Sequence, residues 1–305
     1  MQSTTEMTPT ETLIENAERQ RRLLRRACWA GVAFVVAVIL FPIGNSLFVR
    51  WQLRQRGWVL DCAMGQRGLP DWTPQWADAW FGKIECAHLE RAPLRASDLE
   101  SLQRFPNLDC MIFESTEVSE SALAAMSQFP ELSALVFNSV QLEPAGLRHF
   151  ATHRKLDAMN FRDMILDDSA LEDLATCHRL TGLRLTGVTD DNLRCLSRLS
   201  KLEGLGLLNC RMTDDGARRL VADHSSLRTL SIYEAPMTDT AMNEFARLPN
   251  LTFLELYDVP ITDSGIQQIK SYPKLQTLTV KNTKLTPEGI TELRRALPSL
   301  HVQNW

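Results

Sequence analysis

The chain has 305 residues, of which 44% are hydrophobic and 23% charged, and its formal net charge is −4. These are the values of a globular protein that is long enough to bury a sizeable core. A slightly acidic total excludes the broad basic field that is typical of nucleic-acid binding, so we expect no nucleic-acid partner.

The N-terminal region predicts a tail followed by a membrane anchor. Residues 1–26 are expected to be a disordered tail that ends in arginines, and residues 27–49 form an uncharged run of 23 residues. As a helix this run would reach roughly 34 Å, enough to cross a hydrocarbon core of about 30 Å. It is apolar on every face, unlike a buried helix of a soluble protein. A cleaved signal peptide is the alternative, but no small-x-small cleavage site follows convincingly.

The arginines that flank this run predict its orientation. Five arginines precede it (Arg19, Arg21, Arg22, Arg25 and Arg26) and three follow it (Arg50, Arg54 and Arg56). Because positive charge favours the cytoplasmic side, we expect a cytoplasmic N-terminus and a single-pass protein whose remaining residues are extracytoplasmic. The opposite orientation stays open and would place the following domain in the cytoplasm.

Residues 50–83 are expected to form a juxtamembrane segment and a tryptophan-rich cap. Four tryptophans occur between residues 58 and 82: Trp58, Trp72, Trp76 and Trp80. Solenoid proteins need a cap that covers the open end of their core. We therefore favour this role over a ligand-binding aromatic cluster.

A unit of about two dozen residues recurs over residues 84–305. Each unit starts with an apolar residue and has two more at offsets of three and five. The starts are Ile84, Leu108, Leu132, Leu156, Leu180, Leu202, Leu227, Leu251, Leu275 and a truncated Leu300. This period and the L-x-x-L-x-L pattern indicate a leucine-rich repeat solenoid, which presents a large ordered surface.

The unit from Leu251 to Lys274 shows how each one is expected to fold. Its first residues form a short strand, and Asp258 begins a turn. Thr262 is the expected N-cap of a helix of about nine residues, and Asp263 suits the positive end of the helix dipole. Alternating strands and helices predict an α/β solenoid with a parallel sheet on the inner arc and helices outside.

This pattern resembles the bacterial leucine-rich repeats related to the ribonuclease-inhibitor-like and cysteine-containing classes. The resemblance is carried by the L-x-x-L-x-L…(V/I/M)-T-D-x-G run at residues 202–217 and 251–266. The chain departs from many such families where they carry a buried asparagine. It has Thr116, Val140, Met164, Val188, Cys210, Ala235, Val259 and Thr283 there, so no continuous asparagine ladder is expected.

The residues that suggest catalysis have simpler explanations. His149 and His153 have a helical metal-ligand spacing, yet we expect both to be exposed on a helix face. The acidic pairs Asp167-Asp168, Asp190-Asp191 and Asp214-Asp215 each begin a helix, where the dipole accounts for them. We expect no enzyme activity, no metal and no cofactor.

The cysteines allow one specific hypothesis. Cys86 and Cys110 both lie two residues after their unit's start, which puts them on neighbouring strands roughly 4.7–4.9 Å apart. A disulfide is possible at that distance in an exported domain, although parallel strands present awkward Cβ directions. Free thiols, or a bond from Cys62 to either, stay open.

Strand residues at offsets two, four and six are expected to face the inner arc, where a partner would bind. Aromatic anchors on a rigid surface are frequent binding determinants. The candidate partner-binding residues are Tyr233, Phe253, Glu255, Tyr257, Lys281, Arg184 and Arg162. The alternative is that these aromatics only pack against one another.

Together these features predict a membrane-anchored, non-catalytic scaffold for protein–protein recognition at the cell envelope. A scaffold that binds carbohydrate or an envelope polymer is the first alternative, since aromatic rings also stack on sugars. A cytoplasm-facing regulatory adaptor is the second, if the orientation is reversed.

Overall fold

The computed structural model of the protein describes residues 48–61, 84–143 and 146–304. The chain divides into two compact parts, Met1–Gln52 and Leu53–Trp305. Of the first part, residues 48–52 are described and are helical. No helix among the described residues is long and apolar enough to cross a bilayer. Nearly all of the expected membrane span, residues 27–47, lies outside them, as do Trp72, Trp76 and Trp80.

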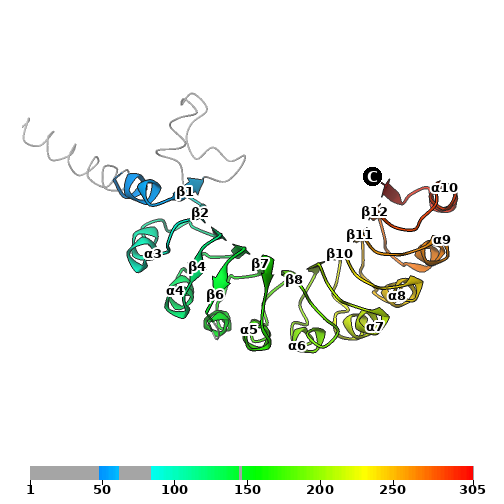
Figure 1. Ribbon diagram of the computed structural model, residues 1–305, viewed down its shortest axis with the longest axis horizontal. Helices are drawn as coiled ribbons and strands as arrows, with labels where there is room; N and C mark the ends of the chain where they lie inside the picture. Colours follow the sequence, from blue (N-terminus) through cyan, green and yellow to red (C-terminus); the bar gives the residue numbers. More distant parts are fainter. Residues whose placement is uncertain (1–47, 62–83, 144–145, 305) are drawn as a thin grey trace, which may run out of the picture. The chain divides into compact units, whose positions relative to one another are not determined.

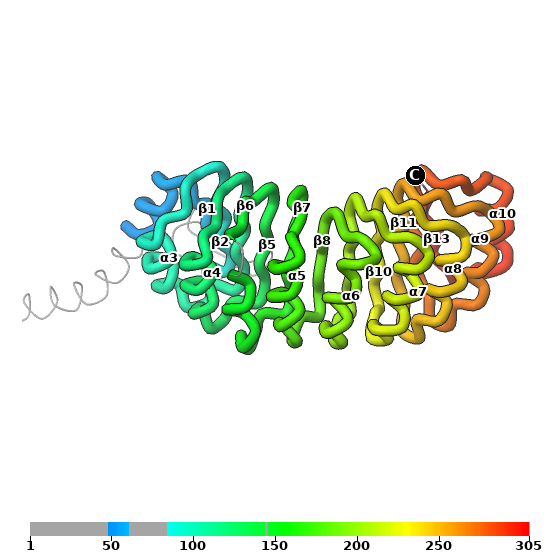
Figure 2. Tube along the Cα trace, turned by 60° about the horizontal axis from the view of Figure 1, so that its bottom comes forward, coloured from blue at the N-terminus to red at the C-terminus, as the bar shows by residue number. Residues whose placement is uncertain are grey.

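The second part is built on one sheet of eleven strands in the order β1-β2-β3-β5-β7-β8-β9-β10-β11-β12-β13 (Figures 1 and 2). All neighbouring pairs are parallel except β1 and β2, which are antiparallel. The strands are β1 (Trp58–Asp61), β2 (Cys86–Glu90), β3 (Cys110–Glu114), β5 (Ala134–Asn138), β7 (Ala158–Ile165), β8 (Gly182–Thr186), β9 (Gly204–Leu208), β10 (Thr229–Tyr233), β11 (Phe253–Tyr257), β12 (Thr277–Lys281) and β13 (His301–Asn304). A second, two-stranded sheet joins β4 (Glu117–Val118) to β6 (Gln141–Leu142).

Helices connect the strands and lie on the outer side of the curve, as Figure 1 shows. They are α3 (Ala96–Leu102), α4 (Glu120–Met126), η1 (Leu147–Phe150), α5 (Asp168–Leu174), α6 (Leu193–Leu196), α7 (Asp214–Asp223), α8 (Asp239–Phe245), α9 (Asp263–Ile266), η2 (Gln267–Ser271) and α10 (Pro287–Ala296). The α/β solenoid expected from the sequence is therefore confirmed. The expected uniform length of about nine residues is wrong, because α6 and α9 have only 4 residues and η1 and η2 are 3-10 helices.

The repeat predicts the strand register along most of the sheet. Cys86, Cys110 and Ala134 are paired in register, and so are Gly182, Gly204, Thr229, Phe253 and Thr277. The unit that starts at Leu156 breaks the pattern. In it, β7 runs for 8 residues, and its register with β8 shifts between Asn160 and Ile165, so Ile165 pairs with Thr186 in place of Arg162. This extra length is a bulge in the sheet.

Apolar residues at offsets three and five form the core. In β11, for example, Leu254 and Leu256 are fully buried between the less buried Phe253, Glu255 and Tyr257. The N-terminal units place three phenylalanines at offset five, Phe113, Phe137 and Phe161. Their rings stack at centroid distances of 5.6 and 5.3 Å. Stacked rings in successive units tie each unit to the next by dispersion and apolar burial.

The two ends of the sheet are covered by short strands. Trp58 in β1 is 1% exposed and meets the edge of Phe113 at 5.9 Å, so it extends the aromatic core by one step. At the other end, Val302 in β13 and Leu300 before it are buried. The position of Trp58 fits its expected capping role, and Leu300 and Val302 cover the other end, because exposed core edges of a solenoid need a cover.

Each complete unit has a left-handed residue at offset seven, directly after its strand except in the longer β7, where it lies within the strand. The residue at offset seven has φ between 43° and 76° throughout: Arg91, Ser115, Ser139, Asp163, Gly187, Asn209, Glu234, Asp258 and Asn282. Only one of these is glycine, and most of the others have short polar side chains that tolerate this conformation. The turn expected at Asp258 is confirmed. Its backbone N–H donates to the Lys281 carbonyl at 3.0 Å, which links the turn to the next strand.

An aspartate–threonine ladder joins the helix starts of the C-terminal units. In each step the aspartate of one Thr-Asp pair accepts two hydrogen bonds from the N-cap threonine of the next unit, one from its N–H and one from its hydroxyl. The pairs are Asp190–Thr213, Asp214–Thr238, Asp239–Thr262 and Asp263–Thr286, with N–H···O distances of 2.8–2.9 Å and O–H···O distances of 2.5–2.6 Å. Ionised acceptors make such bonds short and strong. The ladder therefore connects consecutive units on the helix side.

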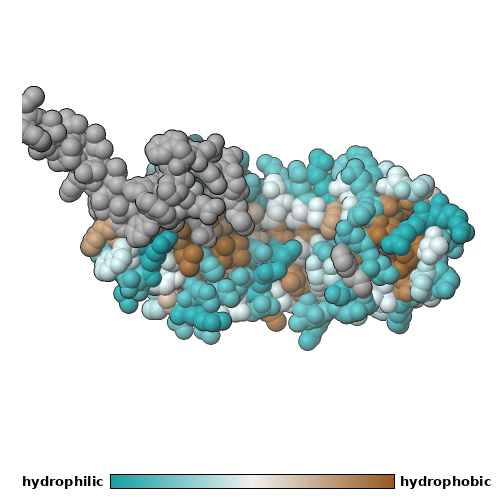
Figure 3. Space-filling model, turned by 90° about the horizontal axis from the view of Figure 1, so that it is seen from above, coloured by the Kyte–Doolittle hydropathy of each residue, from teal (hydrophilic) through white to brown (hydrophobic). Residues whose placement is uncertain are grey.

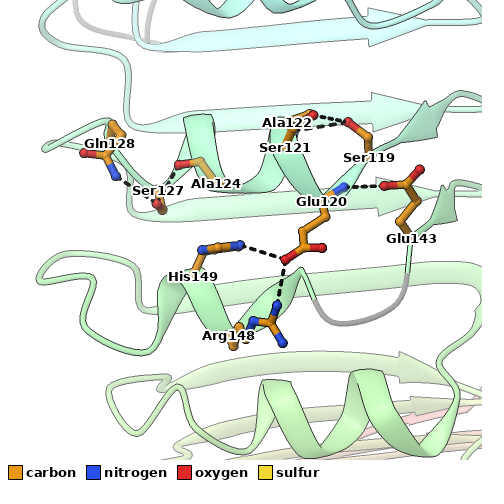
Figure 4. A network of polar contacts seen from close by, with 10 residues as sticks. All are labelled: Ser119, Glu120, Ser121, Ala122, Ala124, Ser127, Gln128, Glu143, Arg148 and His149. Carbon is orange, nitrogen blue, oxygen red and sulfur yellow. Dashed lines mark hydrogen bonds and ion pairs between the residues drawn. The ribbon is translucent and has the colours of Figure 1, made fainter.

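The N-terminal units use a different link at the equivalent place, shown in Figure 4. The backbone N–H of Glu120, which begins α4, donates to the Glu143 carboxylate at 2.8 Å. The Glu120 carboxylate in turn accepts from Arg148 at 2.7 Å and lies 3.4 Å from Nε2 of His149. Glu143, Arg148 and His149 all belong to the following unit, so this network also connects one unit to the next.

Candidate functional site

The concave face of the sheet carries the residues that the repeat leaves free to vary. Figure 3 looks onto this side and shows apolar surface along its floor between hydrophilic edges. Buried and partly exposed residues alternate along the strands, for instance in β8 and β11. The expectation that offsets two, four and six face this side is confirmed there, because alternate side chains of a strand point to opposite faces.

The main cluster on this face is made by Tyr233, Tyr257, Glu255 and Lys281, called the tyrosine cluster below. Tyr233 ends β10 and Tyr257 ends β11, and their rings stack with centroids 4.8 Å apart at an interplanar angle of 15°. The Tyr233 hydroxyl donates to Glu255 Oε2 at 2.8 Å, and Lys281 Nζ lies 5.9 Å from the centre of the Tyr257 ring. Four side chains from three adjacent strands are thus held in one arrangement.

The pKa shifts in the cluster keep the Tyr233 hydroxyl protonated, so it is the hydrogen-bond donor to Glu255. Burial and the neighbouring Glu255 raise the pKa of Tyr233 to about 12. The same two causes raise the pKa of Tyr257. Both phenols are therefore protonated near neutral pH, and the carboxylate of Glu255 is the negative group of the cluster. The surface combines two half-buried aromatic rings with one charge of each sign.

The other expected binding residues lie elsewhere. Phe253 begins β11, at the opposite end of that strand from Tyr257, and makes no ring contact within the described part of the chain. Arg162 lies in the shifted stretch of β7 and is exposed. Ile165 takes the place beside Thr186, while Arg162 pairs in register with Asn138 of β5. The role of Arg162 in partner binding stays a prediction.

Arg184 lies across a floor of glycines. A Cβ atom at Gly206 would come within 2.9 Å of Arg184 Nε and 3.2 Å of its Cγ, so the missing side chain of Gly206 gives the arginine its space. Gly182, Gly204 and Gly206 line a shallow hollow of about 380 Å³ on the concave face, together with Arg184. The positive charge of Arg184 lowers the pKa of Tyr233, an effect smaller than the rise caused by burial and Glu255. Arg184 therefore lies close enough to interact with the tyrosine cluster.

Ile165 is a feature that the repeat pattern did not predict. It is 73% exposed and pairs with Thr186 where β7 and β8 end. Ile165 and Tyr233 line one hollow of about 620 Å³ beside the strand ends. The only hint in the sequence is the short spacing of 22 residues from Leu180 to Leu202, next to the bulged unit.

The histidine pair has a structural role. His149 lies beside Glu120, as described above. His153 is buried, which corrects the expectation of an exposed helix-face residue. Its Nε2 lies 2.8 Å from the Phe129 carbonyl, and its Nδ1 accepts from the N–H groups of Lys155 and Leu156. These bonds require a neutral ring with its proton on Nε2. In the described residues, no group of three or more His, Cys, Asp or Glu side chains is placed to hold a metal.

The acidic pairs also have structural roles. Asp167 is the N-cap of α5, accepting from Ala170 N–H at 2.8 Å, and Asp190 and Asp214 belong to the aspartate–threonine ladder. The expectation that the acidic pairs begin helices is confirmed for Asp167-Asp168 and Asp214-Asp215. It is wrong for Asp190-Asp191, because α6 starts later, with Asn192 as its N-cap and no acidic residue in its first turn. The link that Asp190 and Asp214 make to the next unit was not predicted.

Cys86 and Cys110 are register partners on β2 and β3, and no disulfide joins them. The side chain of Cys86 forms a hydrogen bond that lowers the pKa of the Cys110 thiol. Cys210 and Cys177 are buried, and burial raises the pKa of each to about 11. Cys62 lies outside the described residues.

Comparison with known proteins gives a likeness of fold. No protein-family model and no curated protein sequence matches the chain. Among solved structures it is similar to internalin C2 from Listeria monocytogenes, with 19% identity, coverage of 68% of this chain and 84% of that one, and a TM-score of 0.48. It is also similar to an internalin, inlF, from the same organism, with 15% identity, coverage of 72% and 81%, and a TM-score of 0.42. At these values no residue or partner is carried over, and the fold conclusion depends on this chain's own strand order and register.

Proposed function

We propose that the chain is a non-catalytic, leucine-rich-repeat-like scaffold that binds a protein partner on its concave face, through the tyrosine cluster. The observation that carries this proposal is the stacked pair Tyr233–Tyr257, tied to Glu255 and flanked by Lys281. Half-buried aromatic residues that are already held in place lose little conformational entropy on binding, which is typical of residues that dominate a protein interface.

The proposal is tested with Tyr233→Ala and Tyr257→Ala combined. Removing two such anchors should weaken binding of the partner by at least about a hundredfold. The matched control is Thr229→Ala with Thr277→Ala, because these residues lie on the same face at the other end of β10 and β12. Circular dichroism checks that both variants are folded. Equal capture of the partner by the tyrosine variant and the control would refute this placement.

A carbohydrate ligand is the second candidate for the same surface, since aromatic rings stack on sugars. The arrangement favours protein, because the two tyrosine rings already cover one another, which leaves each ring only one outer face for a sugar. Parallel protein and glycan arrays separate the two candidates. Binding to a glycan that is lost in the tyrosine variant would replace the protein partner.

We further propose that residues 27–49 anchor the protein in a membrane and that the repeats lie outside the cytoplasm. The support is the uncharged run and the arginine distribution in the sequence. Phe48 and Trp51 agree with an interfacial position, since their rings stack at 6.0 Å and are 54% and 52% exposed. External protease applied to intact cells and to spheroplasts tests the orientation. Repeats that stay protected in spheroplasts would favour the cytoplasmic regulatory adaptor.

A further inference from the structure

A basic hollow lies beside the N-terminal ends of β7, β8 and β9. The tyrosine cluster lies at the other, C-terminal ends of the strands. It has a volume of about 470 Å³ and is lined by Ser133, Arg154, Lys155, Leu156, Asp157, Arg179, Thr181 and Lys201. Four of these eight residues are cationic and one is acidic. The whole chain has a net charge of −4, so this local excess of positive charge is not a general property of the surface.

The cations recur at one position of the repeat. Lys155, Arg179 and Lys201 each lie three residues before the first residue of β7, β8 and β9, and those first residues are paired in register. Successive strands are roughly 4.8 Å apart, so the three positions form a line along the sheet edge. The same position is uncharged or acidic in the two units on either side, at Asn107, Glu131, Ser226 and Asn250, and is lysine again only in the outer units, at Lys83 and Lys274.

These charges are poorly neutralised by the protein itself. Lys155 pairs with Glu131. Arg154, Arg179 and Lys201 are exposed, and in the described part of the chain their side chains have no ion pair or hydrogen bond. Other surface arginines, such as Arg228 and Arg247, are paired with glutamates. Like charges gathered without counter-charges repel one another, which costs folding stability unless an anion occupies the site.

The lining restricts the class of anion. Ser133 and Thr181 donate their hydroxyl protons to the Asp109 and Asp157 carbonyls, which leaves their oxygens as acceptors for hydroxyl groups of a ligand. None of the eight residues is aromatic, whereas single-stranded nucleic acid is bound by stacking its bases. A bilayer surface is flat on this scale and would not fill a hollow. We infer that this edge binds a linear anionic polysaccharide, whose sulfate, phosphate or carboxylate groups follow the line of cations and whose hydroxyls meet Ser133 and Thr181.

The test measures binding of a fluorescent dextran sulfate of fixed length to the full chain, by anisotropy. Arg179→Gln with Lys201→Gln should weaken binding about tenfold and reduce its salt dependence, because two charge contacts are lost. Lys284→Gln with Arg295→Gln is the matched control. These two are also exposed, have no ion pair with a described residue, and remove the same charge from the last complete unit. The control should stay within about twofold of the parent.

Three further binding measurements distinguish an anionic polysaccharide from other classes of anionic ligand. Uncharged dextran should not bind, and single-stranded DNA and anionic vesicles of equal charge should bind more weakly than dextran sulfate. No binding of dextran sulfate, equal weakening in both double variants, or preference for DNA or vesicles would overturn the inference. The Tyr233→Ala/Tyr257→Ala variant should bind dextran sulfate normally, so failure of this site and failure of the proposed protein site are separate results.

Discussion

Removing one rung of the aspartate–threonine ladder should destabilise the solenoid much more than removing the acidic residue next to it. Asp214 and Asp215 both lie in the first turn of α7. Asp214 accepts the N–H of Thr238 at 2.8 Å and its hydroxyl at 2.6 Å, whereas Asp215 is 68% exposed and pairs with Arg218 of its own helix. The pair Asp214→Ala and Asp215→Ala therefore isolates the link between units.

The magnitude follows from what each side chain does. Both carboxylates interact with the same helix dipole, which contributes about 0.3–1 kcal/mol each. Asp214 additionally accepts two hydrogen bonds, and bonds to a charged group contribute about 1.5–3 kcal/mol each when buried. Asp214 is partly exposed, so each of its two hydrogen bonds should contribute less than the lower end of that range, about 1.5 kcal/mol. Asp214→Ala should then lower the free energy of unfolding by about 2–3 kcal/mol, against less than about 1 kcal/mol for Asp215→Ala.

Urea unfolding followed by far-ultraviolet circular dichroism measures the difference between the two variants. Hydrogen exchange adds a local reading, since the Thr238 amide should lose protection only in Asp214→Ala. Equal unfolding midpoints for the two variants, with an unchanged Thr238 amide, would show that these aspartates act through the helix dipole alone.

Three other predictions follow from the core and the thiols. Burial lowers the pKa of His224 from 6.5, so the unfolded chain binds the proton more tightly, and stability should fall as pH drops below about 6.5. His224→Leu should flatten the dependence of the unfolding midpoint between about pH 7 and 5, and an unchanged slope would contradict this origin. Phe137 is fully buried in the middle of the ring stack, so Phe137→Ala should cost about 3–5 kcal/mol by thermal or urea unfolding, and Phe137→Leu less than about 1.5 kcal/mol. Iodoacetamide should modify Cys110, whose pKa is lowered, before the buried Cys177 and Cys210, as mass spectrometry of the native and denatured chain can show; equal native rates would contradict the burial.

The fold was predictable because the repeat is a pattern of apolar burial. Residues at offsets three and five must reach a common core, so their spacing alone fixes strands, register and the inward direction. The Thr-Asp pair illustrates where this reasoning stops. A threonine before a helix is readily identified as an N-cap, yet the aspartate of the same motif bonds to the next unit. A spacing of 24 residues does not reveal that contact until the two helix starts are placed side by side.

The site was predictable only in part, for a related reason. Tyr233, Glu255, Tyr257 and Lys281 lie where the alternation of a regular strand places them. Arg162 keeps this alternation and pairs with Asn138, but the bulge in β7 moves Ile165 into the position beside Thr186. An inserted length in one strand changes every later side-chain position in that strand. The pattern of leucines is unaffected, since the next unit restores it.

Site-specific photo-crosslinking tests the proposed role of the concave face most directly. A crosslinker placed at Tyr257 is compared, in living cells, with one placed at Arg218, which lies on the helix side in α7. We expect one discrete protein adduct from position 257 that disappears when Tyr233→Ala is added, and none from position 218. Equal adducts from both faces, or adducts from position 218 alone, would contradict recognition through the tyrosine cluster.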